Sequence, residues 1–241
     1  MTDYNSMSFE RRDEYPAILQ MPGVLLSHLI IWCFEALPDE ILVGLDVDPE
    51  RKVRPEVSDM FCGEQSRNEL FAGQDYTIGE AKVVNRGNSM TVHHLPEEWT
   101  DEIFSVDRGP RGGRFTHWLH THPNCPAIPS GADADAAQWT EGVDLILGVD
   151  FSPEFSAPWV EGVEGERRII AGSERPQPSK GESWFRRRMA RQNRPVLGKA
   201  PTGHSIHGIE LIAFHRSGIG INVIFVDEDD LPYGWPFLTT E

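Results

Sequence analysis

Two histidines and one aspartate within fourteen residues have the types and spacing of metal ligands. They are His120, His122 and Asp133, in the run HTHPNCPAIPSGAD. Composition predicts a strand over residues 114–122, and alternate side chains of a strand share a face. The two histidines, with Trp118, therefore point the same way, and their Cα atoms lie about 7 Å apart. That spacing lets both imidazoles reach one metal ion at about 2.0–2.1 Å.

The aspartate belongs to a second pattern, which has two interpretations. Ser130 and Asp133 have the spacing of a capping box, which would begin a helix after Ser130 without any metal. If Asp133 joins the histidines instead, two imidazoles and a carboxylate leave one tetrahedral position for water. Such an open position is typical of a catalytic zinc site rather than a structural one. The upstream histidine pair favours the metal interpretation, because capping does not require it.

The run resembles the JAMM motif of the MPN-domain metalloproteases, H-[ST]-H-P-x6-S-x2-D, at every defined position, Pro123 included. By this resemblance His120, His122 and Asp133 are ligands of Zn²⁺, and Ser130 stabilises the oxyanion of a tetrahedral intermediate. The resemblance implies a single α/β domain of the MPN (JAMM) type, with a mixed β-sheet flanked by helices, similar to the cytidine deaminase fold. The pattern covers roughly residues 22–150, with 205–228 as closing strands.

The same family places a glutamate at the start of the strand that follows the first helix. Glu40 in PDEILVG matches this position, although Gly44 stands one residue later than in the family pattern. The chemistry needs such a group, because a carboxylate can take a proton from zinc-bound water and pass it to the leaving amine. Glu35 is the alternative, but it lies within the predicted helix.

Other patterns of zinc enzymes are missing from the chain. There is no HExxH and no H-x-E followed by P-C-x-x-C. His117 is expected on the opposite face of the strand from His120, as a packed or surface residue, and Cys125 is assigned no role. Four other histidines could be extra ligands, but they are expected instead in solvated loops; they are His93, His94, His204 and His207.

Hydrophobic periodicity predicts one α/β domain. A helix is expected over residues 24–37, a short helix over 96–104, and a basic helix over 183–194. Strands are expected over residues 40–47, 81–84, 89–93, 114–122, 143–151, 209–215 and 221–227. Residues 1–21 are described as a polar arm, 22–228 as the domain, and 229–241 as a tail. Segments rich in charge, proline and glycine predict insertions near 49–75 and 152–204.

Composition narrows the class of partner. The formal net charge of −16 argues against nonspecific binding to nucleic acid, whose phosphates would repel it. No apolar run approaches the ~20 residues that cross a bilayer, and the N-terminus does not have a signal-peptide pattern. Three cysteines without a paired spacing indicate a reduced, cytoplasmic protein.

The resemblance to the JAMM family implies a zinc-dependent isopeptidase that hydrolyses the amide bond at the C-terminus of a ubiquitin-like modifier protein. Two alternatives remain open. One is trimming of the tail of a sulfur-carrier protein, as some prokaryotic relatives of the family do. The other is a non-catalytic MPN scaffold that binds a partner protein.

Overall fold

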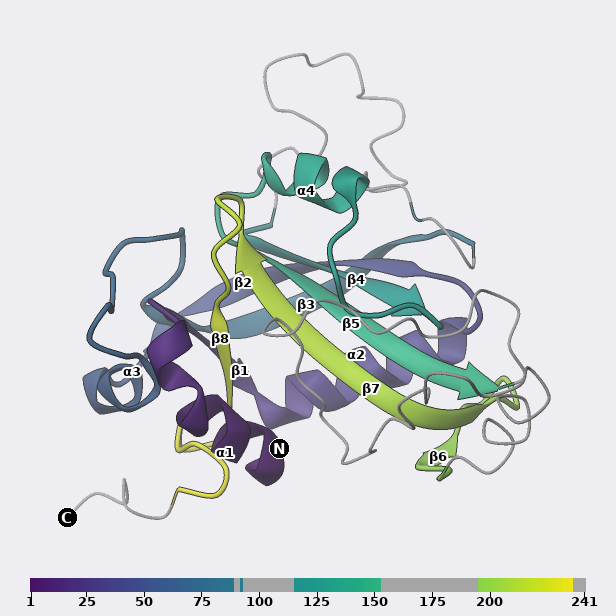
Figure 1. Cartoon of the computed structure of the whole chain (residues 1–241), viewed down its shortest axis with the longest axis horizontal. Coiled ribbons are helices and arrows are strands. Elements are labelled where there is room, and N and C mark those ends of the chain that lie inside the picture. The colour runs from purple at the N-terminus through teal and green to yellow at the C-terminus, as the bar shows by residue number, and fades with distance from the viewer. Residues whose placement is uncertain (89–91, 93–114, 153–194, 236–241) are drawn as a thin grey trace, which may run out of the picture.

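The fold is a mixed α/β arrangement around a curled six-stranded sheet (Figure 1). The computed structural model describes residues 1–88, 92, 115–152 and 195–235. The sheet has the order β3-β2-β4-β5-β7-β6, and β1 and β8 form a separate parallel pair. The elements are α1 (Thr2–Glu10), η1 (Arg12–Glu14), β1 (Ile18–Pro22), α2 (Gly23–Ala36), β2 (Ile41–Lys52), α3 (Pro55–Phe61), β3 (Tyr76–Arg86), β4 (His117–Pro123), α4 (Gly131–Ala137), β5 (Val143–Ser152), β6 (Gly198–Lys199), β7 (Ser205–His215) and β8 (Asn222–Val226).

The middle of the sheet mixes both strand directions. β4 pairs with β2 antiparallel and with β5 parallel, and β5 pairs with β7 antiparallel. Most residues of β5 and β7 are buried, which is why both strands read as nearly continuous apolar runs. His120 stands in a row with Leu42, Ile146 and Ile212, so its side chain shares their face of the sheet.

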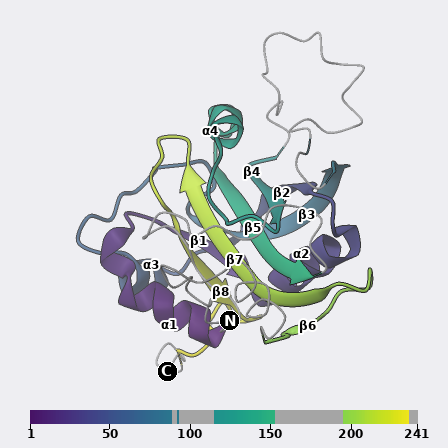
Figure 2. The same ribbon diagram turned by 45° about the vertical axis from the view of Figure 1, so that its right-hand side comes forward.

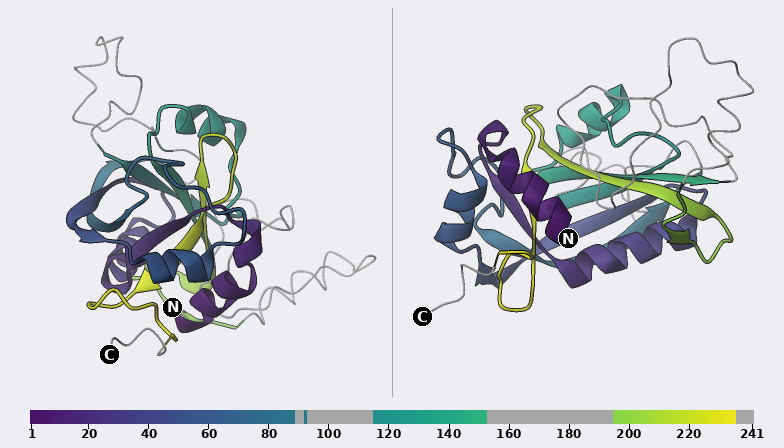
Figure 3. Two further views of the ribbon diagram at one scale, coloured as in Figure 1. Left: turned by 90° about the vertical axis from the view of Figure 1, so that its left-hand side faces the viewer. Right: turned by 60° about the horizontal axis from the view of Figure 1, so that its bottom comes forward.

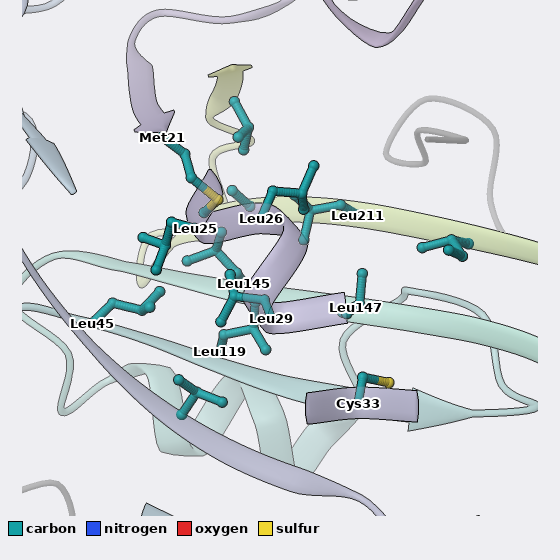
Figure 4. Close-up of a cluster of buried hydrophobic side chains, with 14 of the residues drawn as sticks. Met21, Leu25, Leu26, Leu29, Cys33, Leu45, Leu119, Leu145, Leu147 and Leu211 are labelled. Carbon is teal, nitrogen blue, oxygen red and sulfur yellow. The ribbon is translucent and has the colours of Figure 1, made fainter. Parts of the chain in front are cut away.

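Helices cover the two faces of this sheet unequally. α2 lies on one face, where its leucines pack on the sheet with Leu119, Leu145, Leu147 and Leu211 (Figure 4). α4 lies on the opposite face, over a smaller cluster (Figures 1 and 3); the cluster is Ala127, Ala137, Ile146, Ile212 and Phe214. The predicted metal ligands belong to this second face.

The elements predicted from apolar periodicity are confirmed where the structure describes them. The helix expected over 24–37 is α2, and the strands around the histidines, 143–151, 209–215 and 221–227 are β4, β5, β7 and β8. β2 and β3 run beyond their predicted ends. The segment 49–75, where an insertion is expected, carries the end of β2 and the helix α3. The strand over 89–93, the helices over 96–104 and 183–194, and most of the 152–204 insertion lie outside the described residues.

Residues 1–21 are folded into the molecule and do not form a separate arm. They contain α1, η1 and most of β1, and α1 and α3 lie beside the β1–β8 pair (Figure 2). The Asn5 amide donates to the Phe225 carbonyl and accepts from the Phe225 N–H, at 2.8 and 3.0 Å. This side chain therefore pairs with the backbone of β8 as a neighbouring strand would. Composition alone could not predict the packing, because it depends on contacts more than 200 residues apart.

Among the described residues, the helices are too short or too polar to cross a bilayer.

Candidate metal centre

Three side chains, each able to supply a metal ligand, meet at the end of β4 beneath α4. The Nε2 atoms of His120 and His122 are 3.0 Å apart. Asp133 places Oδ1 3.1 Å from the first Nε2 and Oδ2 3.5 Å from the second. Ligand atoms around a tetrahedral Zn²⁺, each about 2.0–2.1 Å from the ion, are separated by about 3.3–3.4 Å. The nearest atoms of the three side chains are thus separated by distances close to that value, and these residues could hold a metal ion.

The fold supplies this geometry through two separate elements. β4 is a central strand, and its alternation aims both imidazoles at the same face. Asp133 is the third residue of α4, and Ser130 is the N-cap. Both halves of the capping box are present, with Ser130 Oγ accepting from Asp133 N and Asp133 Oδ2 accepting from Ser130 N at 2.6 Å. The two interpretations of Ser130 and Asp133 are thus compatible, because the capping bonds orient the carboxylate that faces the histidines.

The loop between β4 and α4 also orients one imidazole. His122 Nδ1 lies 2.8 Å from the carbonyl oxygen of Pro126. A carbonyl oxygen only accepts, so Nδ1 carries the proton and Nε2 keeps its lone pair for a metal ion. Such a partner for the second ring nitrogen is the usual arrangement of a histidine ligand.

The close approach of the carboxylate and the two imidazoles shifts the pKa values of Asp133 and His122. Burial alone would raise the pKa of Asp133, but hydrogen bonds with both imidazoles and with the Ser130 amide hold it well below its usual range. Burial lowers the pKa of His122, whereas Asp133, the Pro126 carbonyl and Glu40 raise it, and the balance is a raised pKa. The carboxylate is therefore ionised and available as a ligand.

Glu40 lies beside this cluster. It immediately precedes β2, whose Leu42 pairs with His120, and continuing that antiparallel register by two residues puts Glu40 opposite His122. Its side chain is 8% exposed. Burial raises the pKa of Glu40 to about 7, with Asp133 adding to the rise and His122 opposing it. A carboxyl group with that pKa can accept and release a proton near neutral pH.

Cys125 also lies near Glu40. Burial and the charge of Glu40 raise the pKa of its thiol, so the thiolate that a nucleophilic cysteine needs is disfavoured. The Ser130 hydroxyl, although it accepts from Asp133 N, still has a proton to donate.

The other histidines of the described chain do not join the cluster. His117 is buried on the opposite face of β4, as expected, and accepts from Val143 N while burial lowers its pKa to about 3. The prediction that His204 and His207 are solvated was wrong: both are buried. β7 begins earlier than predicted and includes His207, and the Phe151 ring packs against His204. His93 and His94 lie outside the described residues.

In comparisons with known proteins, no family model matches the sequence, and no curated protein matches it either.

Proposed function

We propose that this chain is a zinc metalloprotease of the JAMM type with an MPN fold, and that His120, His122 and Asp133 bind the zinc ion. The observation that carries the proposal is a buried group of two imidazoles and one carboxylate, whose nearest atoms are 3.0–3.5 Å apart, with a second carboxylate beside it. This group is formed by the residues that the resemblance to the JAMM motif assigns as zinc ligands. A structural zinc site would have four protein ligands, whereas this group supplies three.

Two residues beside the ligands, Glu40 and Ser130, have roles in amide hydrolysis. When bound, Zn²⁺ supplies Lewis acidity and lowers the pKa of a coordinated water. Glu40 accepts the proton of the attacking water and then passes it to the leaving amine. The Ser130 hydroxyl donates a hydrogen bond to the oxyanion of the substrate carbonyl. Cys125 takes no part, because its raised pKa keeps it as a thiol.

The proposed substrate is the amide bond between the C-terminus of a ubiquitin-like modifier and a lysine side chain. This choice follows the resemblance of the motif to the JAMM family. A tail ending in Gly-Gly suits a site recessed between a sheet and a helix, because glycine lets a backbone pass close to other atoms.

The experiment offers two kinds of substrate to the zinc-loaded protein. A modifier ending in Gly-Gly is joined either to a peptide through a lysine side chain or to a linear C-terminal extension, and the products are identified by mass. We expect release of the intact modifier from the lysine conjugate. A chelator should abolish cleavage, added zinc should restore it, and thiol alkylation should not affect it. Cleavage of the linear extension alone would instead support trimming of a sulfur-carrier tail.

Glu40→Gln is the matched control, because it keeps the shape of the site and removes its proton acceptor. If the zinc-loaded protein cleaves neither substrate, the protease proposal is overturned in favour of a scaffold that binds a partner.

A further inference from the structure

β7 carries a buried acid in an otherwise apolar stretch. Glu210 stands in the run IELIAFH, and it is 3% exposed. A carboxylate removed from water costs several kcal/mol unless polar partners compensate. The position of Glu210 in the sheet indicates which site of the protein this carboxylate acts on.

The strand register places Glu210 on the face of the metal centre. Glu210 pairs with Gly148 of β5, and Gly148 pairs with His122 of β4. Residues paired across neighbouring strands project to the same face. Glu210 therefore stands two strands from His122, about 10 Å at Cα. The residue between them on β5 is a glycine, so β5 contributes no side chain between the two groups.

One peptide group connects Glu210 to the metal centre. The N–H of Ala127 donates to Glu210 Oε2 at 3.4 Å, a long hydrogen bond. The carbonyl of Pro126 accepts from His122 Nδ1 at 2.8 Å. This N–H and this carbonyl belong to the same planar amide. A carboxylate at the N–H end increases the negative charge on the carbonyl oxygen and strengthens its bond with the imidazole.

We propose that Glu210 is a positioning residue of the metal centre, acting on His122 through the Pro126–Ala127 peptide. The carboxylate holds the β4–α4 loop in place and makes His122 a stronger ligand through its Nδ1–H bond. Outer partners of this kind typically contribute 10–100-fold to metal affinity. The inference rests on the proposed function only in requiring that His120, His122 and Asp133 bind a metal ion.

Two substitutions separate the charge of Glu210 from its bulk. Glu210→Gln keeps an oxygen that accepts from Ala127 N but loses the charge, and Glu210→Ala loses both. The matched control is Asp144→Asn, which removes the charge of another buried acid. Asp144 lies on β5 four residues before Gly148, so both residues project to the same face of the sheet. Affinity for Co²⁺ is measured by competition with a chelator, the Co²⁺ absorption spectrum reports coordination, and thermal unfolding of the metal-free proteins reports stability.

We expect Glu210→Gln to weaken Co²⁺ binding about tenfold and Glu210→Ala up to about 100-fold. The Co²⁺ spectrum should change in both, and Asp144→Asn should bind Co²⁺ as the parent does. The inference is overturned if Glu210→Gln binds Co²⁺ within about threefold of the parent. It is also overturned if Asp144→Asn weakens binding equally, or if the loss of affinity scales with the loss of metal-free stability. A parent protein that binds no Co²⁺ or Zn²⁺ would instead refute the metal centre on which the proposed function depends.

Discussion

At the scale of single residues, protons and a metal ion compete for the same nitrogen atoms of the site. Nε2 of His122 can bind a metal ion only when it carries no proton, and the raised pKa of His122 favours a proton there. A divalent cation replaces that proton and attracts all three ligand atoms. Metal binding should therefore release protons, and metal affinity should fall as the pH is lowered.

The first prediction concerns the metal itself. The parent should contain about one zinc ion per chain, and His122→Ala should lose most of it, because two remaining ligands do not form a closed site. Elemental analysis of purified protein measures both. His28→Ala, on the exposed side of α2, is the control and should keep its zinc. Full zinc content in His122→Ala would place the metal at another site.

The second prediction concerns proton transfer. Glu40→Gln should keep zinc but reduce the rate of amide hydrolysis by about 10²–10⁴-fold, because the amide cannot accept a proton from water. Glu35→Gln is the matched control, since Glu35 is exposed on α2. If Glu35→Gln is inactive while Glu40→Gln cleaves normally, the assignment of the general base is wrong.

The third prediction follows from the raised pKa of Glu40. In the metal-free protein this pKa is about 7, above its ordinary value of 4.5, so the folded state keeps a proton that the unfolded state loses between these values. Raising the pH from about 5 to 8 therefore destabilises the fold through Glu40, and Glu40→Gln should escape this loss. The difference in unfolding free energy between parent and variant should grow by on the order of 1–3 kcal/mol over that range. Denaturant titrations at both pH values measure it, and a constant difference would contradict the burial of an ionising Glu40.

The metal ligands could be predicted from the sequence, whereas the groups that orient His122 could not. His120, His122 and Asp133 have side chains whose chemistry and spacing are visible in the chain. The Pro126 carbonyl that orients His122 is a backbone atom, which every residue has. The acid in the apolar run of β7 is a visible signal, but its link to His122 depends on a strand register that the sequence does not specify.

At the scale of elements, α4 is a helix of seven residues, too short to be stable by itself. Its stability comes from the cap at Ser130 and from packing over Ile146, Ile212 and Phe214. The strength of the cap therefore affects both the helix and the orientation of Asp133.

The fourth prediction separates capping from catalysis at Ser130. Ser130→Ala should lower the free energy of unfolding by about 0.5–2 kcal/mol, and Ser130→Gly by only a few tenths, because glycine is tolerated at an N-cap. Both variants lack the hydroxyl, so both should lose about 10²–10³-fold in hydrolysis if that group stabilises the oxyanion. Rates of the zinc-loaded variants, compared at equal zinc content, decide between the roles. Normal hydrolysis by Ser130→Gly would leave Ser130 only as a cap.

The elements that periodicity predicts are those that bury an apolar face. α2 has leucines at helical spacing against the sheet, and β5 and β7 are apolar along most of their length. α1 has no such signature, since its sequence TDYNSMSFE is mostly polar. It is stabilised by specific contacts with distant residues, which local sequence patterns do not reveal.

At the scale of the whole molecule, these contacts join the two ends of the described chain. β1 pairs in parallel with β8, and α1 packs on β8 through Asn5 and Ser8. The Asn222 amide in turn donates to the carbonyls of Ser8 and Phe61, which connects α1, β8 and α3. The N-terminal segment therefore contributes to the stability of the domain, whereas the metal ligands belong to β4 and α4.

The fifth prediction tests whether these two parts of the molecule are energetically separate. Asn5→Ala removes both hydrogen bonds with Phe225 and a third to the Tyr233 carbonyl. The Phe225 carbonyl still accepts from the Tyr233 N–H, but the buried Phe225 N–H loses the Asn5 acceptor, which should cost about 1–3 kcal/mol of unfolding free energy. Ser6→Ala is the matched control, because Ser6 bonds only within α1 at an exposed position. Affinity for Co²⁺ should not change in either variant, since substitutions without shared partners act independently. Denaturant unfolding and chelator competition measure the two quantities, and a large loss of metal affinity in Asn5→Ala would show that packing of α1 on β8 controls the metal centre.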